Sequence, residues 1–120
     1  MNSYFKQFGS NKEEALTNLL PLVNLVIDAH VEGDYEKFSS VCSKRFLSKV
    51  TKDNFELAYQ HFQPQMGAII AKTLLTAIKQ RGQIVLVYVA KFSNTEDDVL
   101  IRIALCKEND EAKIDWIVIE

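Results

Sequence analysis

Few residues of this chain combine an ionisable side chain with a place on an apolar face. His30 is the clearest, because it ends a series of apolar residues spaced three and four apart between residues 15 and 30, which predicts one face of a helix. On that face the imidazole could point into an apolar interior, where burial tunes its pKa. The alternative is a histidine at the helix boundary, which interacts favourably with the C-terminal end of the helix dipole.

Tyr59, His61 and Tyr88 are further candidates for a phenol or an imidazole near such an interior. Aromatic residues at helical or strand spacing are more often simply core residues, and that interpretation stays open for all three. Asp28 and His30 are two residues apart, so on a helix they diverge and form no dyad. The sequence contains no nucleophile motif, no glycine-rich phosphate loop and no metal-ligand spacing. It therefore predicts no metal and no cofactor.

A group of basic residues lies between positions 44 and 52, just before the acidic residue Asp53. It could contact an anionic ligand or partner, although a solvated connector explains it as well. The net charge of −2 gives no positive field, and no exposed aromatic residues are interleaved for base stacking, so we expect no nucleic-acid partner. The basic residues are Lys44, Arg45, Lys49 and Lys52.

Composition indicates one folded domain of 120 residues, with 48% apolar and 25% charged residues. The N-terminus lacks the apolar core of a secretory signal, and the longest apolar stretch, residues 84–90, is too short to span a membrane. Cys42 and Cys106 are too few for a disulfide framework. We expect a cytoplasmic chain with two reduced thiols and no membrane partner.

Capping and breaking residues predict three helices in the first half. Ser10 and Glu13 have the spacing of a capping box, and Gly33 suits the end of this first helix. Pro21 predicts a kink or a break within it. The second and third helices are predicted at residues 35–42 and about 51–62, with a connector at 43–50.

Three β-branched runs separated by short polar connectors predict an antiparallel meander in the second half. Residues 68–81 fit a helix and a hairpin strand equally well. Strict alternation would put Trp116 on the same face as Ile114 and Val118, opposite Asp115. Both faces of the sheet are then apolar, so its outer face should meet a partner, most simply an identical subunit. The runs are residues 84–92, 99–106 and 114–119.

The order of these elements resembles the nuclear transport factor 2-like superfamily, and most closely its small bacterial members of uncharacterised function. The residues that carry this resemblance are structural and specify no activity; they are 31–38, 87–92, 98–105 and 113–117. The resemblance implies an α+β fold in which three helices pack on a curved, four-stranded antiparallel sheet, with a strand at 68–80. The order of the elements divides the single domain into an aromatic arm at 1–10 (Tyr4, Phe5 and Phe8), a helical half at 11–66 and a sheet at 68–120.

The resemblance also implies a cone-shaped pocket between the helices and the sheet. We expect a non-catalytic domain that homodimerises through its sheet and holds a small apolar ligand in the cone. The alternative is a small isomerase- or dehydratase-like enzyme that uses His30 with Tyr59 or Tyr88. The pocket residues that we expect are Val23, Ile27, His30, Tyr59, Tyr88 and Trp116.

Overall fold

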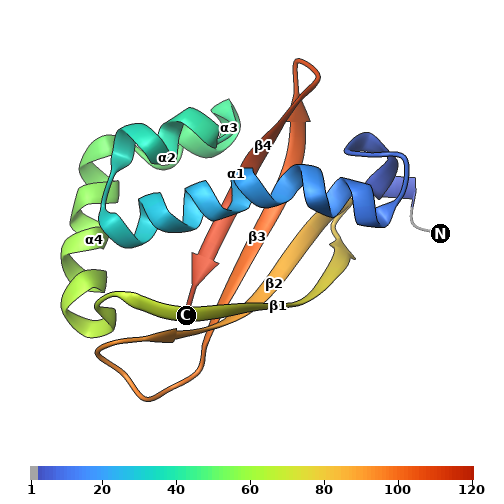
Figure 1. The fold of residues 1–120 in the computed structure, drawn as a ribbon. Helices are drawn as coiled ribbons and strands as arrows, with labels where there is room; N and C mark the ends of the chain where they lie inside the picture. Colours follow the sequence, from blue (N-terminus) through green and yellow to red (C-terminus); the bar gives the residue numbers. More distant parts are fainter. Residues whose placement is uncertain (1–2) are drawn as a thin grey trace.

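The computed structural model describes residues 3–120 and has an α+β architecture, in which helices precede a four-stranded antiparallel meander. In Figure 1, α1 crosses one face of the sheet, while α2, α3 and α4 lie at one side of it. The helical elements are η1 (Ser3–Gln7), α1 (Lys12–Glu32), α2 (Tyr35–Val41), α3 (Lys44–Leu47) and α4 (Lys52–Met66). The strands, in sheet order, are β1 (Ile69–Gln80), β2 (Gln83–Phe92), β3 (Val99–Glu108) and β4 (Glu111–Ile119).

Helix α1 begins one residue later than the expected capping box. Asn11 is the N-cap, and its side chain accepts a hydrogen bond from the Glu14 backbone N–H, while the Glu14 carboxylate accepts from Ser10. The helix continues through Pro21, so the chain keeps one helix here. It ends at Gly33, whose φ of 73° is left-handed and whose N–H donates to the Ala29 carbonyl.

The remaining helices extend the predicted pattern. Asp34 and Thr51 cap α2 and α4 through side-chain oxygens that accept backbone N–H groups. Helix α4 runs past the expected end near residue 62 and contains Pro64. The predicted connector at 43–50 includes the single helical turn α3, which Ser43 caps.

Two tight turns fix the register of the sheet. Arg81 and Gly82 join β1 to β2, and Asn109 and Asp110 join β3 to β4, all four with positive φ. This is the two-residue hairpin geometry that matches the twist of the strands. The segment at 68–80 is therefore a strand, as the resemblance implied.

The inner face of the sheet, which packs against α1, forms the core. It presents Leu86, Tyr88, Ile101 and Ile103 in register, and these side chains are buried with the apolar face of α1. The N-terminal arm adds to this core, since Phe5 and Phe8 are buried; the side chain of Tyr4 lies outside the described part. The other core residues from α1 include Leu19, Val23, Val26 and Ile27.

Strand β4 does not alternate strictly, because its register shifts between the pairs Ala104–Trp116 and Leu105–Ile114. The shift inserts Asp115 as an extra residue, as in a β-bulge. Ile114 and Ile117 consequently share the inner face, whereas Trp116 lies opposite Ala104 on the outer face. The expected placement of Trp116 on one face with Ile114 is wrong for this reason.

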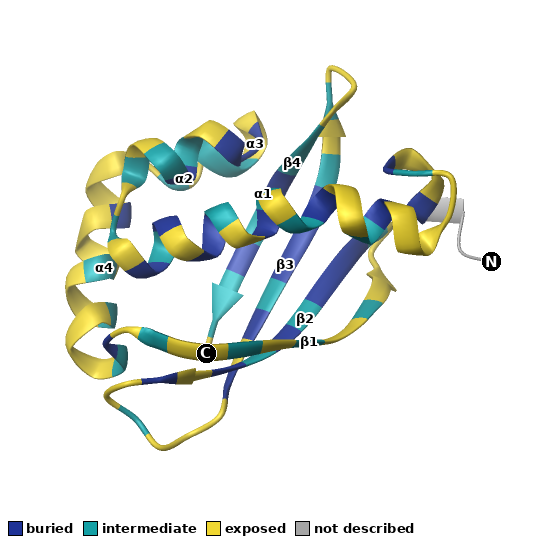
Figure 2. Ribbon diagram, in the orientation of Figure 1, coloured by how far each residue is buried: buried dark blue, intermediate teal, exposed yellow. Residues whose placement is uncertain are grey.

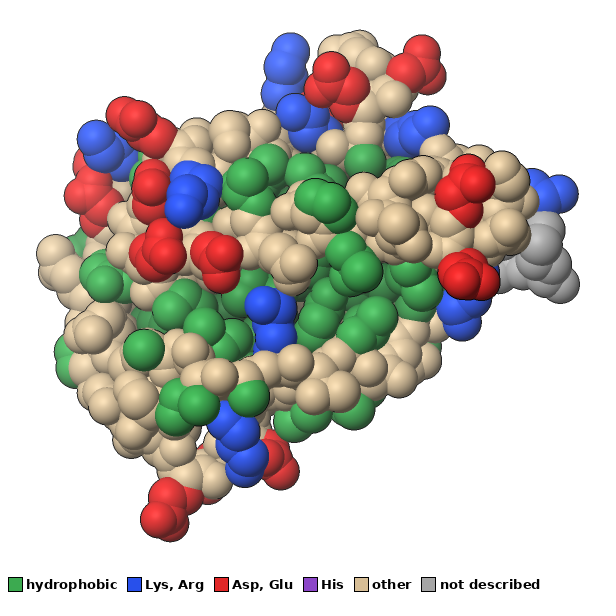
Figure 3. Space-filling model, in the orientation of Figure 1, with side chains coloured by type: hydrophobic (Ala, Val, Ile, Leu, Met, Phe, Trp, Pro, Cys, Tyr) green, Lys and Arg blue, Asp and Glu red, His purple; other side chains and the backbone are tan. Residues whose placement is uncertain are grey.

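The two edges of the sheet differ. Segment Cys42–Ser43 lies along β4, where Cys42 forms a bridge with Ile114 and the Ser43 N–H donates to the Ile114 carbonyl at 2.8 Å. Strand β1 has no strand neighbour on its outer side among residues 3–120. Figure 2 shows β2 and β3 largely buried and β1 largely exposed. In Figure 3, hydrophobic side chains gather on the surface between α1 and β1.

Candidate functional site

A pocket of about 320 Å³ lies between the helices and β4. Helix α1 supplies His30 to its wall, and Ile117 comes from the inner face of β4. Most of the lining is apolar or aromatic, which is typical of sites for small molecules. The other lining residues are Phe38, Phe46, Lys49, Val50, Asn54, Phe55 and Ala58.

His30 stands in a group of aromatic rings. Its ring centroid is 5.3 Å from that of Phe62, 6.3 Å from Phe55 and 6.4 Å from Phe38, all in edge-to-face arrangements. Its Nδ1 atom is buried and has no hydrogen-bond partner within the described residues. Burial lowers the pKa of His30 to about 4, so the imidazole is neutral near pH 7.

The polar residues of this pocket lie towards its mouth. Asn54 and Ala58 are exposed on α4, and the Asn54 side chain donates a hydrogen bond to the Lys49 carbonyl at 3.2 Å. Lys49 brings a positive charge to the same rim. The pocket thus has a polar entrance and aromatic walls, and the imidazole that lines it carries one buried nitrogen without a partner among the described residues.

Tyr59 does not share this pocket. It lies on the other side of α4, in a groove of about 600 Å³ that Gly33, Tyr35 and Glu56 also line. Its ring packs so closely on Gly33 that a Cβ there would lie 2.8 Å from the ring. Tyr59 is therefore a packing residue of the α1–α2 corner.

Tyr88 is buried in the core on the inner face of the sheet, where it pairs with Leu74 and Ile101. Its hydroxyl group has no hydrogen-bond partner among the described residues, and burial raises its pKa. At neutral pH this phenol keeps its proton. His61 is exposed on α4.

The other expected pocket residues lie elsewhere. Val23 and Ile27 are fully buried in the core and do not line the 320 Å³ pocket. Trp116 is on the opposite face of the sheet because of the bulge at Asp115. Of the residues that the sequence brought forward for the pocket, only His30 lines it.

Sequence reasoning missed most of the wall of the pocket. Phe38, Phe46 and Phe55 were not among the expected pocket residues, and Lys49 appeared only in the basic group. What would have identified them is an arrangement of aromatic residues on three helices, α2, α3 and α4, that face His30. That arrangement depends on how the three helices pack, which spacing within any one of them does not report.

The described residues show two further properties. No three His, Cys, Asp or Glu side chains lie close enough to hold a metal ion in this part of the chain. None of its helices has the length and apolar character needed to cross a membrane. A comparison with protein-family models and with curated protein sequences finds no match to this chain.

Proposed function

We propose that this protein is a binding domain that holds a small, largely apolar ligand in the pocket beside His30. The observation that carries this proposal is the aromatic pocket that His30 lines, together with the buried Nδ1 of this imidazole, which has no hydrogen-bond partner among the described residues. A buried polar atom without a partner costs about 1–3 kcal/mol, and a ligand that makes one hydrogen bond recovers that cost.

The chemistry of the wall defines the ligand class. A neutral imidazole accepts or donates one hydrogen bond, and the phenylalanine edges favour a flat apolar body. The volume of about 320 Å³ suits one or two fused rings. We therefore expect a small ring compound with a single hydroxyl or carbonyl group.

The dispersal of the other candidates favours binding over catalysis. Acid–base chemistry of the isomerase or dehydratase kind uses positioned groups that converge on one substrate. Here Tyr59 faces a different groove, and Tyr88 is buried in the core and does not line the pocket of His30. His30 with a pKa of about 4 is also a weak base at neutral pH.

Native mass spectrometry of protein purified from its own host tests this proposal. We expect a small apolar compound to remain bound, and Ala58→Leu at the mouth to reduce its occupancy at least about tenfold by filling space. Gln60→Leu is the matched control, because it adds the same side chain to α4 but lines the groove of Tyr59. Equal occupancy in both variants would contradict the proposal, as would the absence of any bound compound.

We also propose that the protein forms a homodimer through its sheet, along the free edge of β1. Exposed edge strands with apolar side chains are prone to pair with another strand. Ile70 is 68% exposed and Leu75 is 56% exposed on this strand, and Ile78 adds to the same patch. A second copy, related by a two-fold axis, would cover the patch in both subunits.

Sedimentation equilibrium at micromolar concentration tests the pairing. We expect a dimer, with a shift towards monomer for Leu75→Lys. Leu57→Lys is the matched control, since Leu57 is 59% exposed but lies on α4. A monomer in the unsubstituted protein, or an equal effect of both variants, would contradict pairing through β1.

The superfamily resemblance supports the proposed pocket, because the helices and the four-stranded meander occur in the order it implies. We further propose a cytoplasmic location, where both cysteines would stay reduced. Burial raises the pKa of Cys42 to about 12 and that of Cys106 to about 11, so both thiols stay protonated and unreactive near pH 7.

A further inference from the structure

A second pocket lies on the outer face of the sheet, between α3 and the β1–β2 turn. Its volume is about 340 Å³. It does not belong to the pocket of His30, although Phe46 and Lys49 border both. Its lining residues are Arg45, Phe46, Lys49, Arg81, Gln83, Asp115 and Trp116.

The floor of this outer pocket is fixed by a hydrogen-bond network around Asp115, which is 6% exposed. Its carboxylate accepts hydrogen bonds from the Ser43 hydroxyl at 2.9 Å, from Arg45 Nε at 3.2 Å and from Gln83 Nε2 at 2.6 Å. Gln83 in turn accepts from the Trp116 indole N–H at 3.3 Å. The bulge in β4 thus places one carboxylate and one indole ring in a defined arrangement.

The charges of the lining favour an anion. Arg45 is neutralised by its ion pair with Asp115. Lys49 and Arg81 form no ion pair with any described residue, so the pocket carries a net charge of +2 on a chain whose net charge is −2. Arg81 lines the pocket from the tight β1–β2 turn, where its φ is 53°.

Trp116 supplies a flat surface beside these cations. The Arg102 guanidinium lies 5.9 Å from its ring centroid and is paired with Glu120. Arg102 borders a smaller neighbouring pocket of about 150 Å³ and is absent from the lining of the outer pocket. Trp116, Arg81 and Gln83 border both pockets, whereas Arg102 lines only the smaller one.

We propose that the outer pocket binds a flat ring that carries a phosphate or a carboxylate group. The ring would stack on Trp116, since aromatic stacking on an indole tolerates many ring types. The anionic group would lie between Arg81 and Lys49, where a guanidinium offers paired donors to either oxyanion. The volume of the pocket limits the ligand to the size of about one or two rings.

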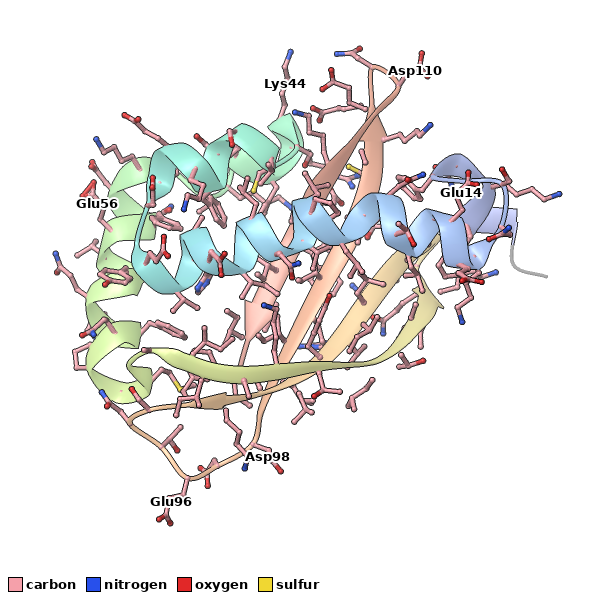
Figure 4. The ribbon with its side chains drawn as sticks, in the orientation of Figure 1. Glu14, Lys44, Glu56, Glu96, Asp98 and Asp110 are labelled. Carbon is pink, nitrogen blue, oxygen red and sulfur yellow. The ribbon has the colours of Figure 1, made fainter. Side chains whose placement is uncertain are left out.

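This assignment divides the basic group of residues 44–52. Arg45 and Lys49 line the outer pocket, whereas Lys52 lines the groove of Tyr59. Figure 4 shows Lys44 pointing outward at the end of α3, away from the body of the protein. Lys52 therefore serves as a charge-matched control for a residue of the pocket.

Isothermal titration calorimetry with four probes tests the proposal. Adenosine 5′-monophosphate and 2-naphthoate carry a ring with a phosphate and with a carboxylate, respectively. Adenosine carries the ring alone, and inorganic phosphate carries the anion alone. We expect at least one of the first two to bind, and to bind about tenfold or more tightly than adenosine and phosphate do. The comparison of these two shows which ring-bearing anion the pocket prefers.

Three variants connect the binding to this pocket. Arg81→Gln should weaken it about tenfold, and Lys52→Gln should leave it within about twofold. Trp116→Leu should weaken the ring-bearing probe and leave phosphate unchanged, with circular dichroism as the check on folding. Ala58→Leu, which fills the pocket of His30, should have no effect, so this test is independent of the proposed function.

Several results would overturn the proposal. One is that neither ring-bearing anion binds at millimolar concentration. Another is that phosphate alone binds as tightly as the ring-bearing anions, which would remove the role of Trp116. A third is that Arg81→Gln and Lys52→Gln weaken binding equally, which would indicate a diffuse charge effect.

Discussion

His30 makes the stability of the fold depend on pH between about 6.5 and 4. Burial lowers its pKa from 6.5 to about 4 in the folded protein, so the folded state disfavours the charged imidazole. The part of the stability that depends on a neutral His30 is complete above pH 6.5, which is the pKa of this histidine in the unfolded chain. It is lost as the pH falls from there towards the folded pKa, and the loss levels off below about 4.

The size of this loss follows from the two pKa values. Linkage gives a decrease in the free energy of unfolding of about 1.4 kcal/mol at about pH 5.5 and about 2.5 kcal/mol at about pH 4.5. The limit is about 3 kcal/mol. His30→Gln removes this contribution but keeps every carboxylate, so the difference between variant and wild type isolates it.

Urea denaturation of both proteins from about pH 7.5 to about pH 4.5 measures this difference. We expect the wild type to lose about 2.5 kcal/mol more than His30→Gln across that range. His61→Gln is the matched control for the loss of a histidine, because His61 is exposed on α4. Parallel curves for wild type and His30→Gln would refute the burial of a neutral imidazole.

Three further predictions concern packing and the outer face. In urea denaturation, Gly33→Ala should lower the free energy of unfolding by about 2 kcal/mol and Gly82→Ala by about 1 kcal/mol. Both glycines have positive φ, but only the substitution at Gly33 places a methyl group against Tyr59, so equal decreases would contradict this reasoning. Trp116→Ala should cost about 2 kcal/mol, less than the 3–5 kcal/mol typical of a fully buried tryptophan, and a cost above about 4 kcal/mol would place the indole in the core. Asp115→Ala should cost about 2 kcal/mol near neutral pH, since its hydrogen-bond donors lose their acceptor. Burial raises the pKa of Asp115, but these hydrogen bonds outweigh burial and hold the pKa below 3.8 in the folded protein. The stability that the ionised carboxylate contributes is therefore complete above pH 3.8 and is lost as the pH falls through the lower pKa of the folded state. In thermal melts, the stability difference between wild type and Asp115→Ala should be smaller at about pH 2 than at about pH 7, and an unchanged difference would contradict the network.

Strands β2 and β3 could be predicted residue by residue because their pairing with each other contains no irregularity. Leu86 and Ile103 pair on the inner face, Arg102 lies on the outer face, and both strands alternate regularly between the two faces. Strand β4 could not be predicted this way. Its bulge at Asp115 is accompanied by contacts to Ser43 and Gln83, which are far away in the sequence.

Strand β1 shows how pairing overrides local preference. Its alanine, leucine and lysine residues favour a helix, yet it is paired with β2 through the Arg81–Gly82 turn. The beginning of α1 differs from the prediction by one position, because Asn11 rather than Ser10 caps it. Side chains of similar chemistry at adjacent positions compete for this role, and spacing alone does not choose between them.

The pocket was predictable only in part. Helical periodicity placed His30 on an inward face, and the structure shows it on the wall of a cavity. Phe55 and Tyr59 are four residues apart on α4, yet they line different grooves. Whether an aromatic residue fills the core or lines a cavity depends on the packing of α4 against α1 and β4.

Side-chain nitrogen NMR of the two histidines tests the central claim most directly. The probe is 2-naphthol, a flat apolar ring with one hydroxyl group. If it binds in the pocket, its hydroxyl group bonds to the buried Nδ1 of His30, so that resonance should shift and saturate while the nitrogens of His61 stay unchanged. Unchanged His30 resonances at saturating 2-naphthol, or equal shifts for both histidines, would contradict the account.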